Sequence, residues 1–240
     1  MERNVSSVDD VLELLDGFFE DDADRWTSKG AGWWDGFYRD RDRGVPFFRP
    51  APDESLVAWH ENRLLPDGGR ALDLGCGAGR NAIWLAQHGF AVDAVDLSST
   101  ALDWARERAE SAGVDVRFTQ GNIFEVDDTF TGYDFVYDSG CFHHLPPHRR
   151  LSYRWLLERV LHPGGAFGLV CFAWGAMGSE APDASFYREG RLSGGVAYSE
   201  QDLRRLFSWM RPVELRRMEK QPDDSPVFGE DFLWAGLFSR

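Results

Sequence analysis

Two hydrophobic patterns alternate along the middle of the chain. Short apolar runs bounded by Gly, Pro or Asp predict buried strands, whereas apolar residues spaced three or four apart predict amphipathic helices. The predicted strands cover residues 69–74, 89–97, 114–118, 133–138 and 166–172, and the predicted helices between them cover 81–88, 98–109 and 149–160. This alternation indicates βαβ units, in which a parallel sheet carries helices on both faces.

The two ends of the chain add further elements. Capping-box spacing predicts one helix after Ser7, running through Phe19, and another after Ser199. Two strand candidates, 213–218 and 232–238, would close the sheet as an antiparallel hairpin. The predicted fold is therefore α/β, a Rossmann-like, seven-stranded, mostly parallel sheet with helices on both faces, a C-terminal antiparallel hairpin and an N-terminal helical and aromatic lid.

Two segments do not follow the alternation. Residues 26–48 hold seven aromatic side chains among glycines and charges, a density that exposed loops rarely carry. The segment either covers a sheet edge or forms a lid over a ligand pocket, and the second interpretation is favoured. Residues 173–198 form a long stretch rich in Gly and Ser, which predicts a second lid. We expect an N-terminal helical and aromatic lid segment over 1–60 and a Rossmann-like domain over 61–240 with a lid insertion at 173–198.

Composition narrows the classes of partner. The formal net charge of −14 opposes non-specific attraction to nucleic acid or an anionic membrane. No apolar run reaches the length of a membrane helix, and the first residues lack the apolar region of a signal peptide, so a soluble cytoplasmic protein is expected. Three cysteines lie far apart, without paired metal-ligand spacing, and predict reduced thiols and no metal site. Monomer and homodimer both stay open.

A glycine-rich turn follows the first strand of the alternating region. The stretch Asp73-Leu-Gly-Cys-Gly-Ala-Gly allows positive φ and lets a ligand approach the main chain. Asp96 ends the next strand about twenty residues later, where a carboxylate can accept hydrogen bonds from ribose hydroxyls. A nicotinamide-dependent oxidoreductase would carry G-x-G-x-x-G, and Asp73 would repel its pyrophosphate. The turn better suits a ligand that carries an ammonium group.

At these residues the chain resembles the class I S-adenosylmethionine-dependent methyltransferases, whose first motif is D/E-x-G-x-G-x-G. The resemblance covers roughly residues 69–172. It implies that the turn binds the methionine portion, that Asp96 binds the ribose and that Leu97 and Ile123 flank the adenine. Asn122 stands where the family often has Asp beside the adenine amino group. The cofactor-binding residues expected on this basis are Trp34, Asp73, Gly75, Cys76, Gly77, Gly79, Asp96, Leu97, Asn122, Ile123 and Asp138.

A second resemblance, to the thiopurine, thiol and halide methyltransferase-like branch, comes from Trp34-Asp35, Val45-Pro46-Phe47 and the run from Asp138 to Arg149. In that branch an N-terminal aromatic segment covers the cofactor. The residues expected to contact the methyl acceptor are Phe47, Phe48, Cys141, His143, Trp174 and Tyr187. His143 and His144 are candidate general bases, although a purely structural role for the pair is the favoured alternative.

The predicted function is transfer of a methyl group from S-adenosylmethionine to a small-molecule acceptor by in-line displacement, with S-adenosylhomocysteine as product. Two alternatives stay open. One is the nicotinamide-dependent oxidoreductase, and the other is a protein that binds S-adenosylmethionine without transferring its methyl group. The sequence leaves the acceptor and the methylated atom undetermined.

Overall fold

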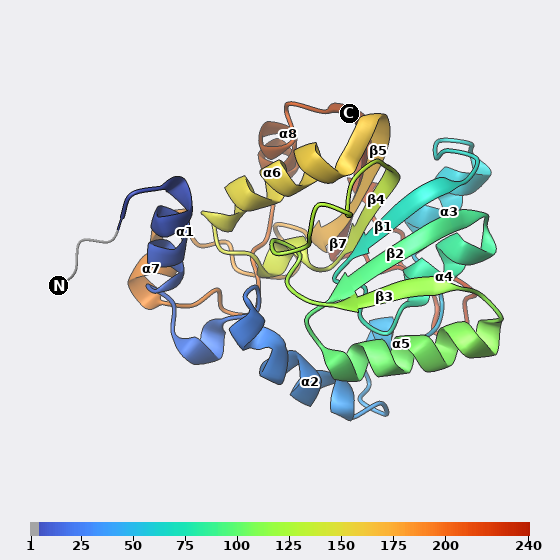
Figure 1. Cartoon of the computed structure of the whole chain (residues 1–240), viewed down its shortest axis with the longest axis horizontal. Helices are drawn as coiled ribbons and strands as arrows, with labels where there is room; N and C mark the ends of the chain where they lie inside the picture. The colour runs from blue at the N-terminus through green and yellow to red at the C-terminus, as the bar shows by residue number, and fades with distance from the viewer. Residues whose placement is uncertain (1–4) are drawn as a thin grey trace.

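Seven strands form one sheet in the order β3-β2-β1-β4-β5-β7-β6 in the computed structural model, which describes residues 5–240 (Figure 1). The strands are β1 (Gly69–Leu74), β2 (Phe90–Asp96), β3 (Val116–Gln120), β4 (Tyr133–Ser139), β5 (Leu161–Phe172), β6 (Arg211–Arg217) and β7 (Leu233–Ser239). The first five are parallel, and β7 runs antiparallel to both β5 and β6. The predicted Rossmann-like sheet with a C-terminal antiparallel pair is confirmed.

Helices cover both faces of this sheet, as predicted. They are α1 (Val8–Asp16), α2 (Ala31–Arg39), α3 (Glu54–Glu61), α4 (Arg80–Gln87), α5 (Ser99–Ala112), α6 (Arg149–Val160), α7 (Asp183–Glu189) and α8 (Glu200–Leu206). Successive strand residues point to opposite faces. Leu72 packs in a core with α6 and α8, whereas its neighbour Ala71 packs in a second core with α3, α4 and α5.

Some element boundaries differ from those predicted. β5 begins at Leu161, so the Pro-Gly-Gly sequence lies inside the strand. Its pairing with β4 shifts between Tyr133 and Phe135, and this irregularity accommodates a segment whose residues otherwise favour a turn. The first helix ends at Asp16 instead of continuing through Phe19.

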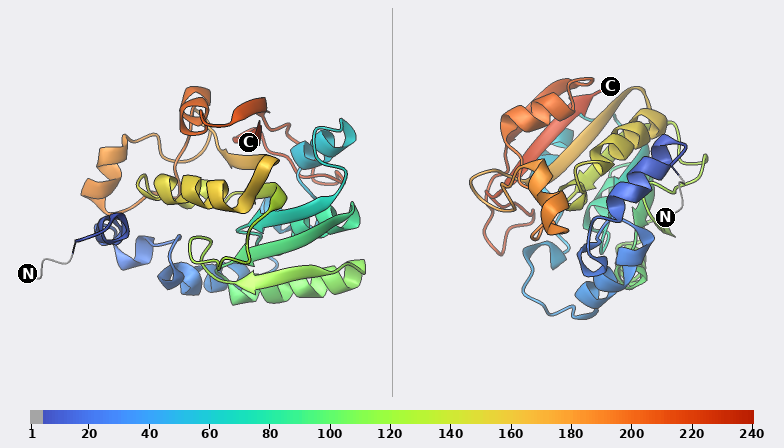
Figure 2. Two further views of the ribbon diagram at one scale, coloured as in Figure 1. Left: turned by 45° about the horizontal axis from the view of Figure 1, so that its top comes forward. Right: turned by 90° about the vertical axis from the view of Figure 1, so that its left-hand side faces the viewer.

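The chain before the aromatic segment lies next to the 173–198 segment. The Glu20 N–H donates to the carbonyl oxygen of Gly190 at 2.9 Å, and Glu20 also pairs with Arg191. Both views in Figure 2 place α1 beside α7. The proposed boundaries at residue 60 and at 173–198 stay predictions. No helix among residues 5–240 has the length and apolar character needed to cross a membrane.

Helix α2 is fixed to the start of α5. The Asp35 carboxylate accepts hydrogen bonds from the Ser98 hydroxyl at 2.7 Å and the Thr100 N–H at 3.0 Å. Ser98 in turn caps α5 by accepting the Ala101 N–H. Because α5 follows β2, this anchor holds the aromatic segment beside the carboxyl ends of the parallel strands, where ligands of open α/β sheets bind.

Candidate active site

The glycine turn between β1 and α4 is built for close approach. Gly77 has a φ of 53°, and a Cβ there would lie 2.5 Å from the Tyr38 hydroxyl. Gly79 has a φ of 77°, and a Cβ there would lie 2.9 Å from that of Ala105. Glycine is required at both positions, for positive φ and for space.

A cavity of about 460 Å³ opens over this turn. Its walls come from the ends of β1, β2 and β4, from the loop after β3, from the short helix Phe142–His144, and from the aromatic segment 26–48. The volume lies in the range typical of small-molecule sites, about 300–1,000 Å³. The aromatic segment therefore covers a pocket, which favours the lid interpretation over a purely structural cover.

Asp73 is the buried carboxyl group at one end of this cavity. Its side chain is 2% exposed, and within residues 5–240 its Oδ2 atom has no hydrogen-bond partner. Burial raises the pKa of Asp73 to about 8; Arg80 opposes this shift, and the nearby charges of Asp138 and Asp53 add to it. A buried acceptor without a donor is costly, so this atom marks a position where a ligand donor fits.

Asp96 stands at the end of β2 and lines the same cavity. Its Oδ2 accepts the Gly77 N–H and its Oδ1 accepts the Ser98 N–H, both at 2.8 Å. Burial raises its pKa to about 6, against the effect of these N–H donors. The carboxylate thus joins the glycine turn to the start of α5, and its remaining lone pairs are available to a ligand.

The residues around the ends of β2 and β3 give the cavity a wall with both polar and apolar side chains. Asn122 lines it, and its amide is oriented by the Phe124 N–H at 3.0 Å and by Glu125 Oε1 at 3.2 Å. Leu97 and Ile123 add apolar surface. This combination of an oriented amide and aliphatic side chains suits the edge and faces of a planar base.

Aromatic rings form the opposite wall. Trp33 stacks on Phe37 at 5.4 Å between ring centroids, and Phe37 stacks on Phe47 at 6.1 Å. The Trp34 indole N–H donates to the backbone carbonyl of Arg25 at 3.1 Å, and its ring meets His144 edge-on. These contacts present flat apolar surfaces to whatever enters the cavity.

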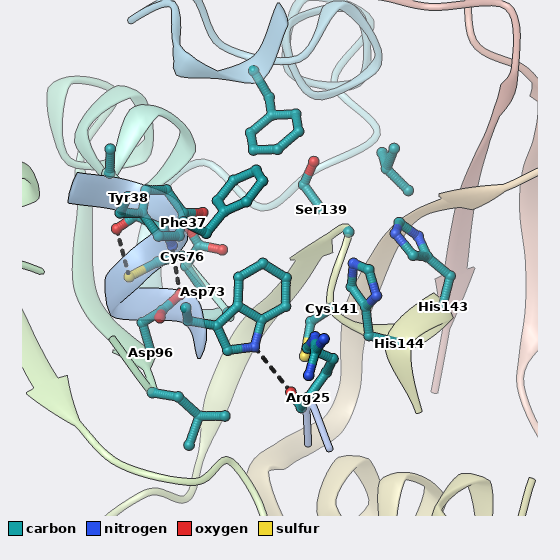
Figure 3. A pocket seen from close by; sticks show the side chains of 18 of the residues that line it. Arg25, Phe37, Tyr38, Asp73, Cys76, Asp96, Ser139, Cys141, His143 and His144 are labelled. Carbon is teal, nitrogen blue, oxygen red and sulfur yellow. Dashed lines mark hydrogen bonds between the residues drawn. The ribbon is translucent and has the colours of Figure 1, made fainter. Parts of the chain in front are cut away.

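The loop after β4 contributes two neutral histidines (Figure 3). The His143 ring stacks on Phe172 at 3.6 Å, and its Nδ1 atom has no partner in the described part of the chain. Burial lowers the pKa of His143 well below its ordinary value. Burial, with a contribution from Arg25, lowers the pKa of His144 to about 4. Both imidazoles are therefore uncharged at neutral pH.

Most of the cofactor-binding residues expected from sequence come together at this cavity. Those that line it are Trp34, Asp73, Gly75, Cys76, Gly77, Asp96, Leu97, Asn122 and Ile123. Of the residues expected to contact the acceptor or act as base, Phe47, Cys141, His143 and His144 also line it. The structure places the remaining five elsewhere, namely Phe48, Gly79, Asp138, Trp174 and Tyr187.

Each of these five has another environment. Asp138 turns inward, where it accepts the Tyr153 hydroxyl at 2.7 Å and holds the loop of His143 through the Cys141 N–H at 2.8 Å. The Tyr187 hydroxyl accepts the His148 backbone N–H at 3.0 Å. Phe48 and Gly79 pack against α5 residues, and Trp174 is 46% exposed. A position in the correct segment does not determine which way a side chain points.

Several polar side chains that line the cavity were not named as site residues from the sequence. Arg25 directly precedes the aromatic segment, Tyr38 lies within it, Arg80 and Asn81 begin α4, and Ser139 ends β4. Arg80 is ion-paired with Asp53 at 2.6 Å and donates to the Ser139 hydroxyl at 3.0 Å. The position of Arg80 directly after the glycine turn was a usable signal, whereas nothing local marks Arg25. No group of three or more potential metal ligands gathers anywhere in residues 5–240.

Comparisons with known proteins assign the chain to a class. A family model described as a methyltransferase domain matches residues 71–165. An uncharacterized methyltransferase of Schizosaccharomyces pombe is 30% identical over 102 residues, which cover 42% of this chain and 70% of that protein. The chain belongs to the class I S-adenosylmethionine-dependent methyltransferase family.

Two solved structures extend the similarity beyond the family motif. One, described as converting a disulfide bond into a thioacetal group during echinomycin biosynthesis, is 25% identical with a TM-score of 0.67, covering 88% of this chain and 91% of that one. The other is the Burkholderia thailandensis 1,6-didemethyltoxoflavin-N1-methyltransferase with bound 1,6-didemethyltoxoflavin and S-adenosylhomocysteine. It is 20% identical with a TM-score of 0.62, covering 100% of this chain and 93% of that one, and shows a shared fold. The chain matches only 50% and 57% of the length of the first two curated relatives.

Proposed function

We propose that this chain transfers the methyl group of S-adenosylmethionine to a small-molecule acceptor by in-line displacement. The observation that carries the proposal is the unpartnered, buried Oδ2 atom of Asp73, which stands at a glycine turn and faces a cavity with aromatic walls. S-adenosylmethionine, when bound, supplies an electrophilic methyl group on a sulfonium and leaves as S-adenosylhomocysteine.

The residues present fit this cofactor. Asp73 offers an acceptor to the methionine ammonium group, Asp96 offers lone pairs to ribose hydroxyls, and Asn122 offers its amide to the adenine edge. The positive φ of Gly77 brings the backbone close without a Cβ in the way. Binding of the ammonium group at Asp73 would favour the ionised carboxylate and so remove the cost of leaving Oδ2 unpaired.

The chain's contribution to catalysis would be alignment and exclusion of water. The stacked rings of Trp33, Phe37 and Phe47 line the cavity. Holding reactants in line can lower a barrier by about 7–11 kcal/mol. Strong base catalysis is not supported, because a pKa of about 4 makes His144 a weak proton acceptor. The histidines fit better as neutral walls and hydrogen-bonding groups.

A small molecule is the best-supported acceptor. The cavity has the size of a small-molecule site, and the net charge of −14 works against a nucleic acid. A neighbour of the same fold holds a small heteroaromatic substrate. All three cysteines are free, which suits action in a reducing compartment such as the cytoplasm.

Calorimetric titration with S-adenosylmethionine, S-adenosylhomocysteine and NADH tests the proposal. We expect both sulfur compounds to bind and NADH not to bind. Binding of NADH alone would replace the proposal with the oxidoreductase alternative. A screen of thiols, phenols, amines and halides for methyl transfer then follows, and cofactor binding with no transfer to any of them would favour a protein that binds the cofactor without using its methyl group.

A further inference from the structure

The side of the cavity beside His144 contains Arg25, a cation that forms no salt bridge within residues 5–240, although the charges of Asp22 and Asp24 act on its pKa. Arg25 lines the cavity, and its guanidinium carbon lies 3.8 Å from the centroid of the Trp33 ring. Its Nη1 atom donates to the carbonyl oxygens of Asp22 and Asp24, each at 2.8 Å. The indole and the two carbonyls fix the plane of the guanidinium before any ligand arrives.

The other edge of this guanidinium is free. Over residues 5–240, neither Nε nor Nη2 of Arg25 has a hydrogen-bond partner, and no carboxylate forms a salt bridge with it. The nearby Asp24 carboxylate is occupied by the backbone N–H groups of Trp26 and Thr27. Two arginines close to the lid segments, Arg149 and Arg191, are by contrast ion-paired, with Asp16 and Glu20. The Nε and Nη2 edge of Arg25 is thus the fork that matches two oxygens of a carboxylate.

The charge of Arg25 affects the pKa of His144, whereas Arg80 is the cation that affects the pKa of Asp73 most. In Figure 3 the Arg25 side chain is drawn on the side of the cavity that holds His144. Arg80 is therefore the better-placed cation for the cofactor's own carboxylate, and Arg25 is left for another molecule.

The rest of this wall suits an aromatic anion. Trp33 and Phe37 give this wall aromatic, apolar surface, and the buried Nδ1 atom of His143 has no hydrogen-bond partner within residues 5–240. Because both histidines are neutral, Arg25 supplies the positive charge on this wall. In a chain of net charge −14, an anionic ligand needs such a local cation to enter.

We propose that Arg25 determines substrate specificity by binding the carboxylate of a planar aromatic methyl acceptor through its Nε and Nη2 edge. This inference rests on the proposed methyltransferase function and names the class of acceptor. It assigns an aromatic carboxylate to the space between the aromatic lid and the histidine loop.

Direct binding tests the assignment without knowledge of the natural acceptor. The protein is first saturated with S-adenosylhomocysteine and then titrated calorimetrically with 2-naphthoate or with the uncharged 2-naphthalenemethanol. We expect 2-naphthoate to bind at least about tenfold more tightly than the alcohol, as a bidentate charged pair allows. Arg25→Met should bring the two affinities within about twofold, and Arg25→Lys, which keeps the charge but loses the fork, should give an intermediate preference.

Arg43 offers a matched control. Its guanidinium also lies over an aromatic ring of the lid, 4.7 Å from the centroid of Phe37, but it does not line the cavity. Arg43→Met should keep the preference for 2-naphthoate. Binding of S-adenosylhomocysteine to each variant shows that the fold is retained.

Three results would overturn the assignment. The first is 2-naphthoate binding no more tightly than the alcohol, including no measurable binding of either, and the second is an unchanged preference in Arg25→Met. The third is a loss of about tenfold or more in S-adenosylhomocysteine affinity in Arg25→Met with the preference intact, which would assign Arg25 to the cofactor's carboxylate. Failure of the unaltered chain to bind S-adenosylhomocysteine would instead overturn the proposed function itself.

Discussion

At the scale of single residues, the two buried carboxyl groups of Asp73 and Asp96 differ in how fully they are hydrogen-bonded. Asp96 is held by two backbone N–H donors, whereas Oδ2 of Asp73 has none among residues 5–240. The pKa of Asp73 is accordingly raised further, to about 8, than that of Asp96, at about 6. The less satisfied group is the one whose state should change most when a cation binds.

Cofactor binding should therefore release a proton from Asp73. Near pH 6.5 the carboxyl is mostly protonated in the free protein, and an incoming ammonium group favours the ionised form. We expect nearly one proton to be released per S-adenosylhomocysteine bound, measured calorimetrically in buffers of different ionisation enthalpy. Asp73→Asn should bind without releasing it. A binding enthalpy that does not depend on the buffer would contradict this role.

Asp96 should contribute to affinity through its hydrogen bonds. Asp96→Ala is expected to weaken cofactor binding by about 1–3 kcal/mol, because a buried acceptor for hydroxyl donors is lost. Asp93→Ala is the matched control, since Asp93 lies on the same strand but pairs with Arg117 and Tyr133 away from the cavity. It should lower the melting temperature while leaving the affinity of the folded protein unchanged. Equal affinities for Asp96→Ala and the unaltered chain would place the ribose elsewhere.

At the scale of elements, the lid depends on the anchor between α2 and α5. Burial raises the pKa of Asp35, but the hydrogen bonds from Thr100 and Ser98 outweigh it and leave the pKa lowered. The carboxylate is therefore charged at neutral pH and binds at the start of α5, where negative charge is favourable.

Removing this anchor should affect stability and binding together. Asp35→Ala is expected to cost about 1 kcal/mol, the usual effect of losing such a helix-terminal acceptor, and to weaken S-adenosylhomocysteine binding because α2 carries the cavity wall. Thermal unfolding and calorimetry measure the two effects. Asp103→Ala on α5 is the control, because it removes an exposed ion pair with Arg106. It should change neither the stability nor the binding of S-adenosylhomocysteine. A loss of stability without weaker binding would show that the lid does not need this anchor.

At the scale of the whole molecule, buried ionisable groups set the pH dependence of stability. Asp73 binds its proton more tightly in the folded chain than in the unfolded one, so the free energy of unfolding falls as pH rises toward about 8. The lowered pKa values of His143 and His144 act in the opposite direction, but only below the ordinary histidine pKa. The effect of Asp73 therefore dominates among these groups above about pH 6.5.

Stability of the ligand-free protein should fall as pH rises from about 6.5 to 8. One such group changes the free energy of unfolding by at most about 1.4 kcal/mol per pH unit. Denaturant titrations across this range measure the slope. Both saturating S-adenosylhomocysteine and Asp73→Asn should flatten it, the first by favouring the ionised carboxylate and the second by removing it. A slope that persists in Asp73→Asn would have to come from other groups.

The order of strands and helices, and the residues at the carboxyl ends of β1, β2 and β3, were predictable from the sequence alone. Strand and helix patterns are local in sequence. Parallel strands joined by helices bring their carboxyl ends to one edge of the sheet, so the sequence predicts that Asp73, Asp96 and Asn122 lie close together. The glycines predict a turn whose backbone has positive φ and can be approached closely, because few other residues tolerate positive φ.

The direction of side chains and the contacts between distant segments became visible only in the tertiary structure. Arg25 and His144 are far apart in sequence, yet they line the same cavity and Arg25 contributes to the lowered pKa of His144; no local pattern predicts this. Asp138 turns toward Tyr153 and Tyr187 toward His148, although their positions in the chain suggested the cavity. Side-chain direction depends on packing between residues far apart in sequence, whereas the order of strands and the glycine turn depend on neighbours. That is why most residues predicted to bind the cofactor line the cavity, whereas the direction of Asp138 and Tyr187 was found only in the structure.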